Sequence, residues 1–231
     1  MWLNAKQVSG AAIEGYRKSL FGACPNHIVI DSLFNDVKLC ELLRVLEEPT
    51  QWKSQKHTYS ALYVNNAQWQ ETSSDQRFVQ RDVWRHEAAR TNNLSSNVAR
   101  NFLLFLRGEQ FLSVLSRIFN VRLTDINVAD PEINTNYFRL GVNDFVKLHA
   151  DDSPGRRVCM LLYLNKAWSD SIGGELVFLG KGDEPIRIEP LYNRCVLFDP
   201  ASKGSEHWVE ELSSGNTNMY RYNVTSWYWS E

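Results

Sequence analysis

The second half of the sequence is divided into short apolar segments separated by turn-forming residues, and this regular division constrains the fold more than any other feature. Eight such segments follow one another: 136–141, 144–150, 157–164, 175–180, 185–190, 194–199, 206–211 and 219–229. Short strands at a spacing of roughly ten residues are typical of β-sandwiches and barrels. We therefore expect a jelly-roll core over residues 121–231.

The first half has helical periodicity instead. Helices are predicted over 9–22, beginning at the capping residue Ser9, over 36–47 after a β-branched strand at 26–31, and over 97–119 in two pieces that break near Gly108. No Pro-, Gly- or Ser-rich linker separates the halves. We predict one α+β domain over 1–231, in which helices of the support segment 1–120 buttress the jelly roll.

The segment between these helices is harder to assign. Residues 51–76 are polar and aromatic without a sustained period, which predicts a long loop or irregular hairpin. Arg77, Arg81 and Arg85 then recur at every fourth position, as on one side of a helix. The plain interpretation of that side is a solvated face, and the alternative is a basic rim that meets an acidic substrate or partner. We predict that residues 51–90 form a mobile lid.

Charge and composition narrow the class of protein. Lys and Arg number 25 against 27 Asp and Glu, so the formal charge of −2 does not favour nucleic acid as a partner. No apolar run approaches the roughly 20 residues of a membrane span, and the amino terminus lacks the apolar stretch of a signal peptide. Cys24, Cys40, Cys159 and Cys195 form no CxxC pair. A cytoplasmic protein with reduced thiols is expected, and its oligomeric state is open.

A histidine and a carboxylate stand two residues apart at the end of the predicted strand 144–150. Because side chains alternate along a strand, His149 and Asp151 point to the same face. The pair is weak evidence alone, but His207 in the predicted strand 206–211 offers a third ligand. Two histidines and one carboxylate on adjacent strands form the facial triad that binds Fe(II) in non-haem oxygenases.

Arg221 follows His207 at the distance of one strand, a turn and a return along the neighbouring strand. A buried arginine beside a metal is costly unless a carboxylate pairs with it. A dicarboxylate that chelates the metal at one end offers such a group at the other end. 2-Oxoglutarate is a dicarboxylate of this kind, so it is the predicted co-substrate.

The order of these motifs resembles the prolyl-hydroxylase type of Fe(II)/2-oxoglutarate-dependent oxygenases. The matching motifs are His149-x-Asp151, Arg157, Tyr163-Leu164-Asn165, Gly173-Gly174-Glu175-Leu176, Phe198-Asp199-Pro200, His207-x-Val209 and Arg221 ahead of Trp227-Tyr228. NHIVIDSLF and the helix after it are similar to the family's opening strand and helix. The chain departs from the family at Phe138, where members often carry Tyr in a Tyr-x-x-Gly. A hydroxyl near the co-substrate is therefore absent or is supplied by Tyr137.

The resemblance implies a double-stranded β-helix, a cupin-like jelly roll, in which His149, Asp151 and His207 bind Fe(II). It also implies that Arg221 and Tyr163 contact the far carboxylate of 2-oxoglutarate, that O₂ is the other co-substrate, and that ascorbate supports turnover. The activity it implies is hydroxylation of an unactivated C–H of an amino-acid-type substrate. That substrate is a residue in a peptide or protein, or a free or carrier-tethered amino acid.

Two alternatives stay open at this point. Asp151 argues against a halogenase, in which a small residue replaces this carboxylate, but desaturation or ring closure needs no different ligands. The non-enzymatic alternative is a jelly-roll binding or scaffold protein without turnover. Substrate contacts are expected outside the matching stretch, at Trp52, Tyr63, Trp69 and Arg81.

Overall fold

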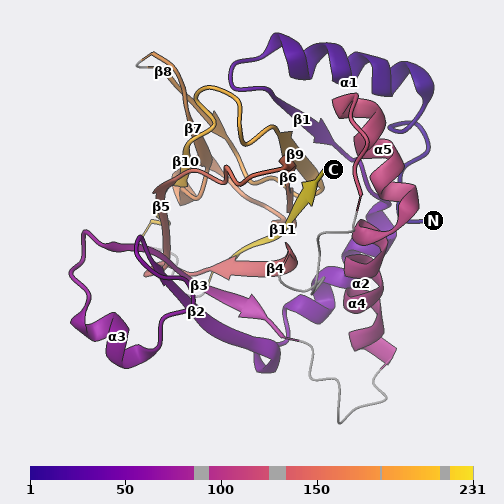
Figure 1. Cartoon of the computed structure of the whole chain (residues 1–231). Coiled ribbons are helices and arrows are strands. Elements are labelled where there is room, and N and C mark those ends of the chain that lie inside the picture. The colour runs from indigo at the N-terminus through magenta and orange to yellow at the C-terminus, as the bar shows by residue number, and fades with distance from the viewer. Residues whose placement is uncertain (86–93, 125–133, 183, 214–218, 231) are drawn as a thin grey trace.

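The computed structural model describes residues 1–85, 94–124, 134–182, 184–213 and 219–230 (Figure 1). Its strands join in one curled antiparallel sheet with the order β1-β9-β6-β11-β4-β3-β5-β10-β7-β8, and β2 pairs with β3. The strands are β1 (His27–Asp31), β2 (Trp52–Thr58), β3 (Arg77–Trp84), β4 (Thr135–Leu140), β5 (Phe145–His149), β6 (Arg156–Tyr163), β7 (Leu176–Lys181), β8 (Glu184–Ile188), β9 (Arg194–Phe198), β10 (His207–Val209) and β11 (Arg221–Trp229). The eight strands predicted beyond residue 120 correspond to β4 to β11. The expected double-stranded β-helix is therefore confirmed.

Side-chain alternation divides the residues of β6 between two of the three hydrophobic clusters among the described residues. In β6, Met160 and Leu162 pack in the core shared with the helices, whereas Cys159, Leu161 and Tyr163 pack in a separate cluster with β7 and β9. This second cluster lies inside the curled sheet. Period-two alternation thus places the predicted co-substrate ligand Tyr163 in the barrel interior.

Helices cover the outer face of the sheet on one side of the molecule (Figure 1). They are α1 (Gly10–Gly22), α2 (Asp36–Leu46), α4 (Leu94–Arg107) and α5 (Glu109–Phe119), and the short α3 (Asn66–Glu71) lies apart from them. Two 3₁₀ turns are η1 (Pro49–Gln51) and η2 (Asp170–Ile172). The Ser9 hydroxyl accepts a hydrogen bond from the Ala12 N–H, which starts α1 at the predicted cap. Gly108 separates α4 from α5, as the sequence predicts.

Of the two alternatives predicted for residues 51–76, the structure has the hairpin: β2 pairs with β3 from Trp52 opposite Trp84 to Thr58 opposite Arg77. The arginines at 77 and 81 lie on β3 and not on the predicted helix. A spacing of four residues repeats one face of a strand as well as one face of a helix, so the arginine pattern could not tell the two apart. Residues 86–90 of the predicted lid lie outside the described residues.

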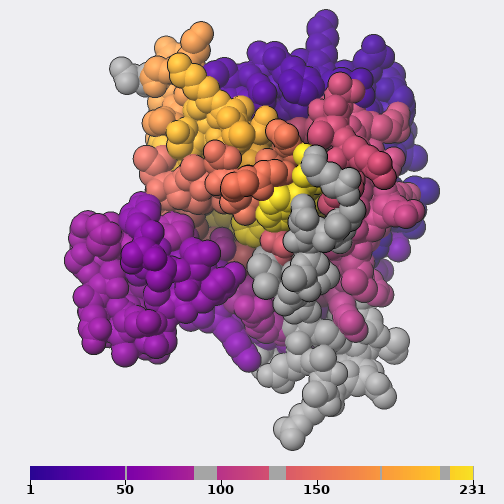
Figure 2. All heavy atoms as spheres, in the orientation of Figure 1, coloured from indigo at the N-terminus to yellow at the C-terminus, as the bar shows by residue number. Residues whose placement is uncertain are grey.

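This hairpin belongs to the barrel wall. β3 pairs with β4 through Asp82 and Val83 and with β5 through Val79 and Gln80, so it bridges two strands of the core. The connection that carries α3 projects as a separate lobe beside the barrel (Figure 2). The strand part of the segment is thus built into the sheet, which restricts any closing motion to the projecting connection.

The four cysteine thiols are unpaired. Cys159 and Cys195 are buried, and burial raises the pKa of both thiols well above the usual range. Cys40 differs, because its Sγ lies 3.2 Å from the Tyr192 hydroxyl and 3.1 Å from the Lys166 ammonium, and these hydrogen bonds lower its pKa. Among the residues that the structure describes, no helix is both long and apolar enough to cross a lipid bilayer.

Candidate metal centre and co-substrate pocket

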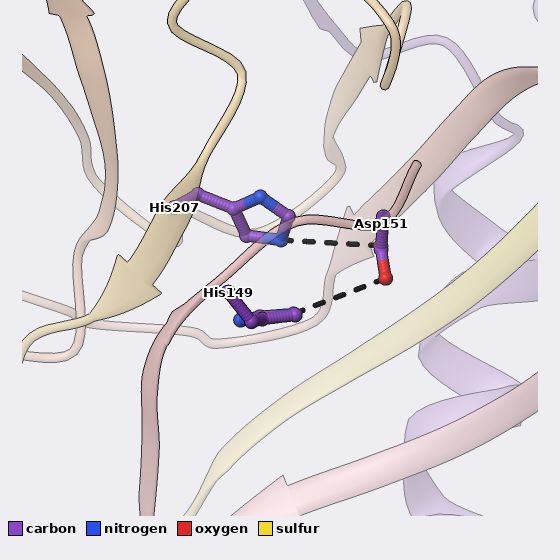
Figure 3. Close-up of side chains that lie close together, drawn as sticks. All are labelled: His149, Asp151 and His207. Carbon is purple, nitrogen blue, oxygen red and sulfur yellow. Dashed lines mark ion pairs between the residues drawn. The ribbon is translucent and has the colours of Figure 1, made fainter. Parts of the chain in front are cut away.

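The predicted triad converges at one point of the barrel. His149 is the last residue of β5, His207 is the first of β10, and the two are direct partners across this antiparallel pair. One ligand atom from each of His149, Asp151 and His207 lies within 4.8 Å of the others (Figure 3). Each histidine Nε2 lies 3.9 Å from an Asp151 carboxylate oxygen. The three side chains therefore surround a space of the size that a metal ion takes.

Backbone carbonyls orient both imidazole rings. The Nδ1 of His149 donates to the Lys147 carbonyl oxygen at 2.9 Å, and that of His207 donates to the Ser205 carbonyl oxygen at 2.9 Å. A carbonyl oxygen can only accept a hydrogen bond, so each Nδ1 carries a proton, and in the neutral ring Nε2 then keeps a free lone pair. Both lone pairs are directed toward Asp151, which is the arrangement a metal needs.

The charge states of the triad also suit a cation. Burial and the neighbouring His149 lower the pKa of His207 to about 4, so its ring is neutral at pH 7. Burial alone would raise the pKa of Asp151, but the two histidines, a hydrogen bond from Trp227 and the nearby Arg156 together bring it below its usual value. The indole Nε1–H of Trp227 donates to Asp151 Oδ2 at 2.8 Å and fixes the carboxylate.

Arg221 and Tyr163 provide a second site deeper in the barrel. Arg221 is 1% exposed; its Nε donates to the Gly174 carbonyl oxygen at 2.6 Å and its Nη1 to Asn223 at 3.0 Å. Its Nη2 and the Tyr163 hydroxyl are buried and have no hydrogen-bond partner among the described residues. The guanidinium carbon lies 4.8 Å from the centre of the Tyr163 ring. Burial raises the pKa of Tyr163 to about 12, so the phenol stays a neutral donor.

These two unpaired donors show whether the residues present suit 2-oxoglutarate. A buried donor without a partner is costly, and a carboxylate accepts from a guanidinium and a phenol at once. One narrow cavity connects the site to the metal ligands, since its wall includes His149, Asp151, His207 and Arg221. A dicarboxylate bound to a metal at the triad can thus extend to Arg221. The residues present therefore fit both Fe(II), through the His₂-carboxylate set, and the co-substrate.

A wider cavity of about 280 Å³ opens on the other side of the triad. Its wall consists of His57, Leu62, Tyr63, Phe78, Val79, Arg81, Asn134, His149, Asp151, Ser153, Arg156 and Trp227. Tyr63 and Arg81 therefore lie where substrate contacts are predicted. A larger groove of about 460 Å³ lies between α2 and the start of β11 and contains none of the triad.

Trp52 and Trp69 do not reach this cavity. Trp52 donates its indole N–H to the Leu46 carbonyl oxygen at 2.8 Å and packs against Tyr222. Trp69 is 4% exposed and lies beside Phe145. Both rings are used in packing the hairpin onto the barrel, so the prediction that they touch substrate is not supported.

The question of the missing hydroxyl is also answered. The Tyr137 hydroxyl donates to the Ala99 carbonyl oxygen at 2.6 Å in the core shared with the helices, on the opposite face of β4 from Phe138. It therefore does not replace the family's tyrosine. The face of the Phe138 ring is instead covered by the guanidinium of Arg81, whose central carbon lies 3.4 Å from the ring centre.

Several residues of the site escaped the sequence-based prediction. Trp227, which holds Asp151, lies six residues after Arg221 on β11, so period-two alternation from Arg221 could have placed it inside the barrel. Arg156 donates to the Asp151 backbone carbonyl oxygen and lies 3.6 Å from its carboxylate. His57 and Phe78 gave no signal, because the sequence does not show how the strands of this segment pair or which side chains face the cavity.

Comparison with known proteins agrees with this geometry. Residues 135–229 match the family model described as the 2OG-Fe(II) oxygenase superfamily. The chain is 34% identical over 127 residues to a protein named prolyl 3-hydroxylase OGFOD1 from Xenopus laevis, and 28% identical over 127 residues to the OGFOD1 of Mus musculus. The alignments cover 52% of this chain but only 23% and 22% of those proteins.

Solved structures share the fold over nearly the whole chain. A prolyl hydroxylase from Trichoplax adhaerens, solved in complex with a peptide fragment of the hypoxia inducible factor oxygen degradation domain, superimposes with a TM-score of 0.65 at 18% identity and covers 97% of this chain and 91% of that one. A prolyl-4-hydroxylase from Pseudomonas putida gives a TM-score of 0.59 at 14% identity and covers 95% and 99%. At these identities the likeness establishes the fold.

Proposed function

We propose that this chain, whose residues 135–229 match the 2OG-Fe(II) oxygenase superfamily, is a hydroxylase that uses Fe(II), 2-oxoglutarate and O₂. One observation carries the proposal: the His149, Asp151 and His207 triad and Arg221 line one cavity, and Arg221 and the neighbouring Tyr163 each keep a buried donor without a partner among the described residues. A scaffold protein without turnover would have no need for two buried donors without partners, since each is costly to maintain.

The chain's residues then have distinct tasks. His149, Asp151 and His207 would hold the iron, which together with 2-oxoglutarate and O₂ supplies the oxidising power for breaking an unactivated C–H bond. Arg221 binds the far carboxylate of 2-oxoglutarate through a charge-assisted hydrogen bond, and Tyr163 adds a neutral one. Trp227 and Arg156 keep the Asp151 carboxylate oriented and ionised.

The proposed substrate is of the amino-acid type, and a prolyl residue is the first candidate. Two relatives are named prolyl 3-hydroxylases, and the similar structures include prolyl hydroxylases. The cavity of about 280 Å³ beside the triad is at the small end of ligand pockets, as one side chain or a free amino acid would require. Tyr63 and Arg81 form part of its wall. Ascorbate as a supporting reductant, a single domain over 1–231 and mobility of the hairpin connection remain predictions.

A cytoplasmic location is also a proposal. It is supported by the four free thiols, which a reducing compartment preserves.

The test is direct. The purified chain is incubated with Fe(II), ascorbate and 2-oxoglutarate labelled at C1, and released CO₂ is counted with and without a library of prolyl peptides and free amino acids. Released CO₂ together with a substrate mass gain of one oxygen atom supports the proposal. His149→Ala and Asp151→Ala should abolish both signals while thermal unfolding remains cooperative. Binding of 2-oxoglutarate without any CO₂ release under all conditions would favour the scaffold alternative.

A further inference from the structure

Arg81 is a cation that the proposed chemistry does not use. It lies on β3 and lines both the narrow cavity that contains Arg221 and the wider cavity beside His149 and Asp151. Its side chain thus stands at the junction between the co-substrate pocket and the open space next to the metal ligands.

The guanidinium of Arg81 is held in place while its terminal donors stay open to the cavity. Its Nε donates to Gln55 Oε1 at 2.9 Å on the neighbouring strand β2, and its central carbon lies over the Phe138 ring. Its two terminal amino groups make no hydrogen bond within the described residues. Burial lowers its pKa to about 10, so the group stays charged at neutral pH. A preorientated, charged fork with free donors is suited to binding an oxyanion.

The charges around the triad leave room for one more anion. A divalent metal, Arg81 and Arg221 are positive, whereas Asp151 and both ends of 2-oxoglutarate are negative. The positive charges therefore outnumber the negative ones. Arg156 near Asp151 and Glu175 near Arg221 carry opposite charges, so this pair does not change the balance. Arg81 is partly buried, so this surplus of positive charge is screened less than at the surface, and it attracts an anionic group to Arg81.

We propose that Arg81 binds a carboxylate of the primary substrate and so makes this protein selective for acidic substrates. The inference rests on the proposed function and specifies its substrate class. The two negative ends of 2-oxoglutarate are already matched, one by the metal and the other by Arg221 with Tyr163. The carboxylate at Arg81 is therefore a different one, and it enters through the wider cavity that Arg81, Tyr63 and Trp227 line.

The carboxylate that binds Arg81 can belong to a free amino acid or to a peptide, and one experiment distinguishes the two. A free amino acid offers its α-carboxylate, and a peptide offers the side chain of a Glu or Asp beside the reacting residue. The protein is loaded with Zn(II) and 2-oxoglutarate, which permits no turnover, and binding is followed by ligand-observed saturation-transfer NMR. The probe pairs are L-proline and L-prolinamide for the first source, and acetyl-Gly-Pro-Glu-amide and acetyl-Gly-Pro-Gln-amide for the second.

In at least one pair, the carboxylate is expected to bind about 10- to 100-fold more tightly than its amide, as a charge-assisted hydrogen bond provides. The pair that shows the difference identifies the source. Arg81→Gln should remove the preference, and Arg81→Lys should keep part of it because it retains the charge without the fork. Arg77→Gln is the matched control: it lies on the same strand, but its guanidinium packs on Trp69 and contacts the Trp69 carbonyl oxygen, away from the cavity.

The wild-type comparison needs no variant to fold, so the proposal is falsifiable without one. It is overturned if neither carboxylate exceeds its amide, or if Arg81→Gln weakens 2-oxoglutarate and leaves the preference intact. Failure of the proposed function is a separate result, because the wild-type protein would then bind no 2-oxoglutarate or release no CO₂ from it.

Discussion

The buried hydroxyl of Tyr163 predicts a substitution with effects of opposite sign on stability and on co-substrate affinity. In the ligand-free protein this hydroxyl is removed from water and has no partner among the described residues. Tyr163→Phe deletes the unpaired group and keeps the ring that lies against Arg221. The ligand-free protein should therefore become more stable, while 2-oxoglutarate loses a hydrogen bond.

The magnitudes follow from the cost of burying a polar group. An unpaired buried donor costs about 1–3 kcal/mol, so the free energy of unfolding should rise by about 1 kcal/mol or slightly more. In a chain of this size that corresponds to a gain of roughly 2–4 °C in Tm. A hydrogen bond to a charged acceptor contributes about 1.5–3 kcal/mol, so the Kd for 2-oxoglutarate should rise about 10- to 100-fold. Arg221→Ala should raise it further, because the ionic contact is the stronger one.

The matched control is Tyr137→Phe. Tyr137 is equally buried, but its hydroxyl donates to the Ala99 carbonyl oxygen at 2.6 Å, so the substitution removes a hydrogen bond that the folded protein makes. It should lower the free energy of unfolding by about 1 kcal/mol and leave the Kd for 2-oxoglutarate unchanged. Urea unfolding of the metal-free proteins measures the first quantity, and calorimetric titration of the Zn(II)-loaded proteins measures the second.

Two results would refute the reasoning. If Tyr163→Phe destabilises the ligand-free protein as much as Tyr137→Phe does, the hydroxyl already has a partner in the folded protein. If it stabilises the protein but leaves 2-oxoglutarate binding unchanged, the hydroxyl is unpaired but does not contact the co-substrate.

Three further predictions concern other parts of the molecule. Burial lowers the pKa of His57 to about 4, below the value of about 6.5 in the unfolded chain, so the unfolded state binds the extra proton as the pH falls. The free energy of unfolding, measured with urea, should therefore fall by about 2 kcal/mol between pH 7 and about pH 5. His57→Gln should remove this contribution to the pH dependence. Gly173 has φ +78°, and a Cβ there would lie 2.2 Å from the Glu211 carbonyl oxygen. Gly173→Ala should therefore lower the free energy of unfolding by about 3 kcal/mol or more. A loss below about 1 kcal/mol would contradict the clash. Cys40, whose pKa is lowered, should react with iodoacetamide at neutral pH before the more exposed Cys24, as peptide mass spectrometry would detect; faster labelling of Cys24 would contradict this.

The metal site was predictable because it depends on alternation along strands. His149 and Asp151 share a face at a spacing of two residues, and the turn signals around residues 194–211 place His207 on a strand. Arg221 could be predicted from the need for a partner to a chelating dicarboxylate. These inferences use local periodicity and the chemistry of side chains, together with the expectation that the strands that carry the ligands are neighbours.

The substrate side of the site could not be predicted in the same way. Arg77 and Arg81 fit a strand as well as a helix, and His57 and Gln55 are polar residues buried on a strand, where alternation predicts apolar ones. Trp52 and Trp69 looked like binding residues because the segment has no core period, yet both pack the hairpin onto the barrel. Tertiary contacts decide these roles, and local patterns do not record them.

The placement of His149 directly opposite His207 affects how the chain assembles. The two histidines are 58 positions apart and meet only when β5 and β10 pair in one register. A slip of one residue would turn His207 to the opposite face of the sheet and dissolve the ligand set. A divalent ion held by this triad would therefore bind the correct pairing more tightly than slipped alternatives and would stabilise it during refolding. The ligand set would thus favour one strand register as well as hold the ion.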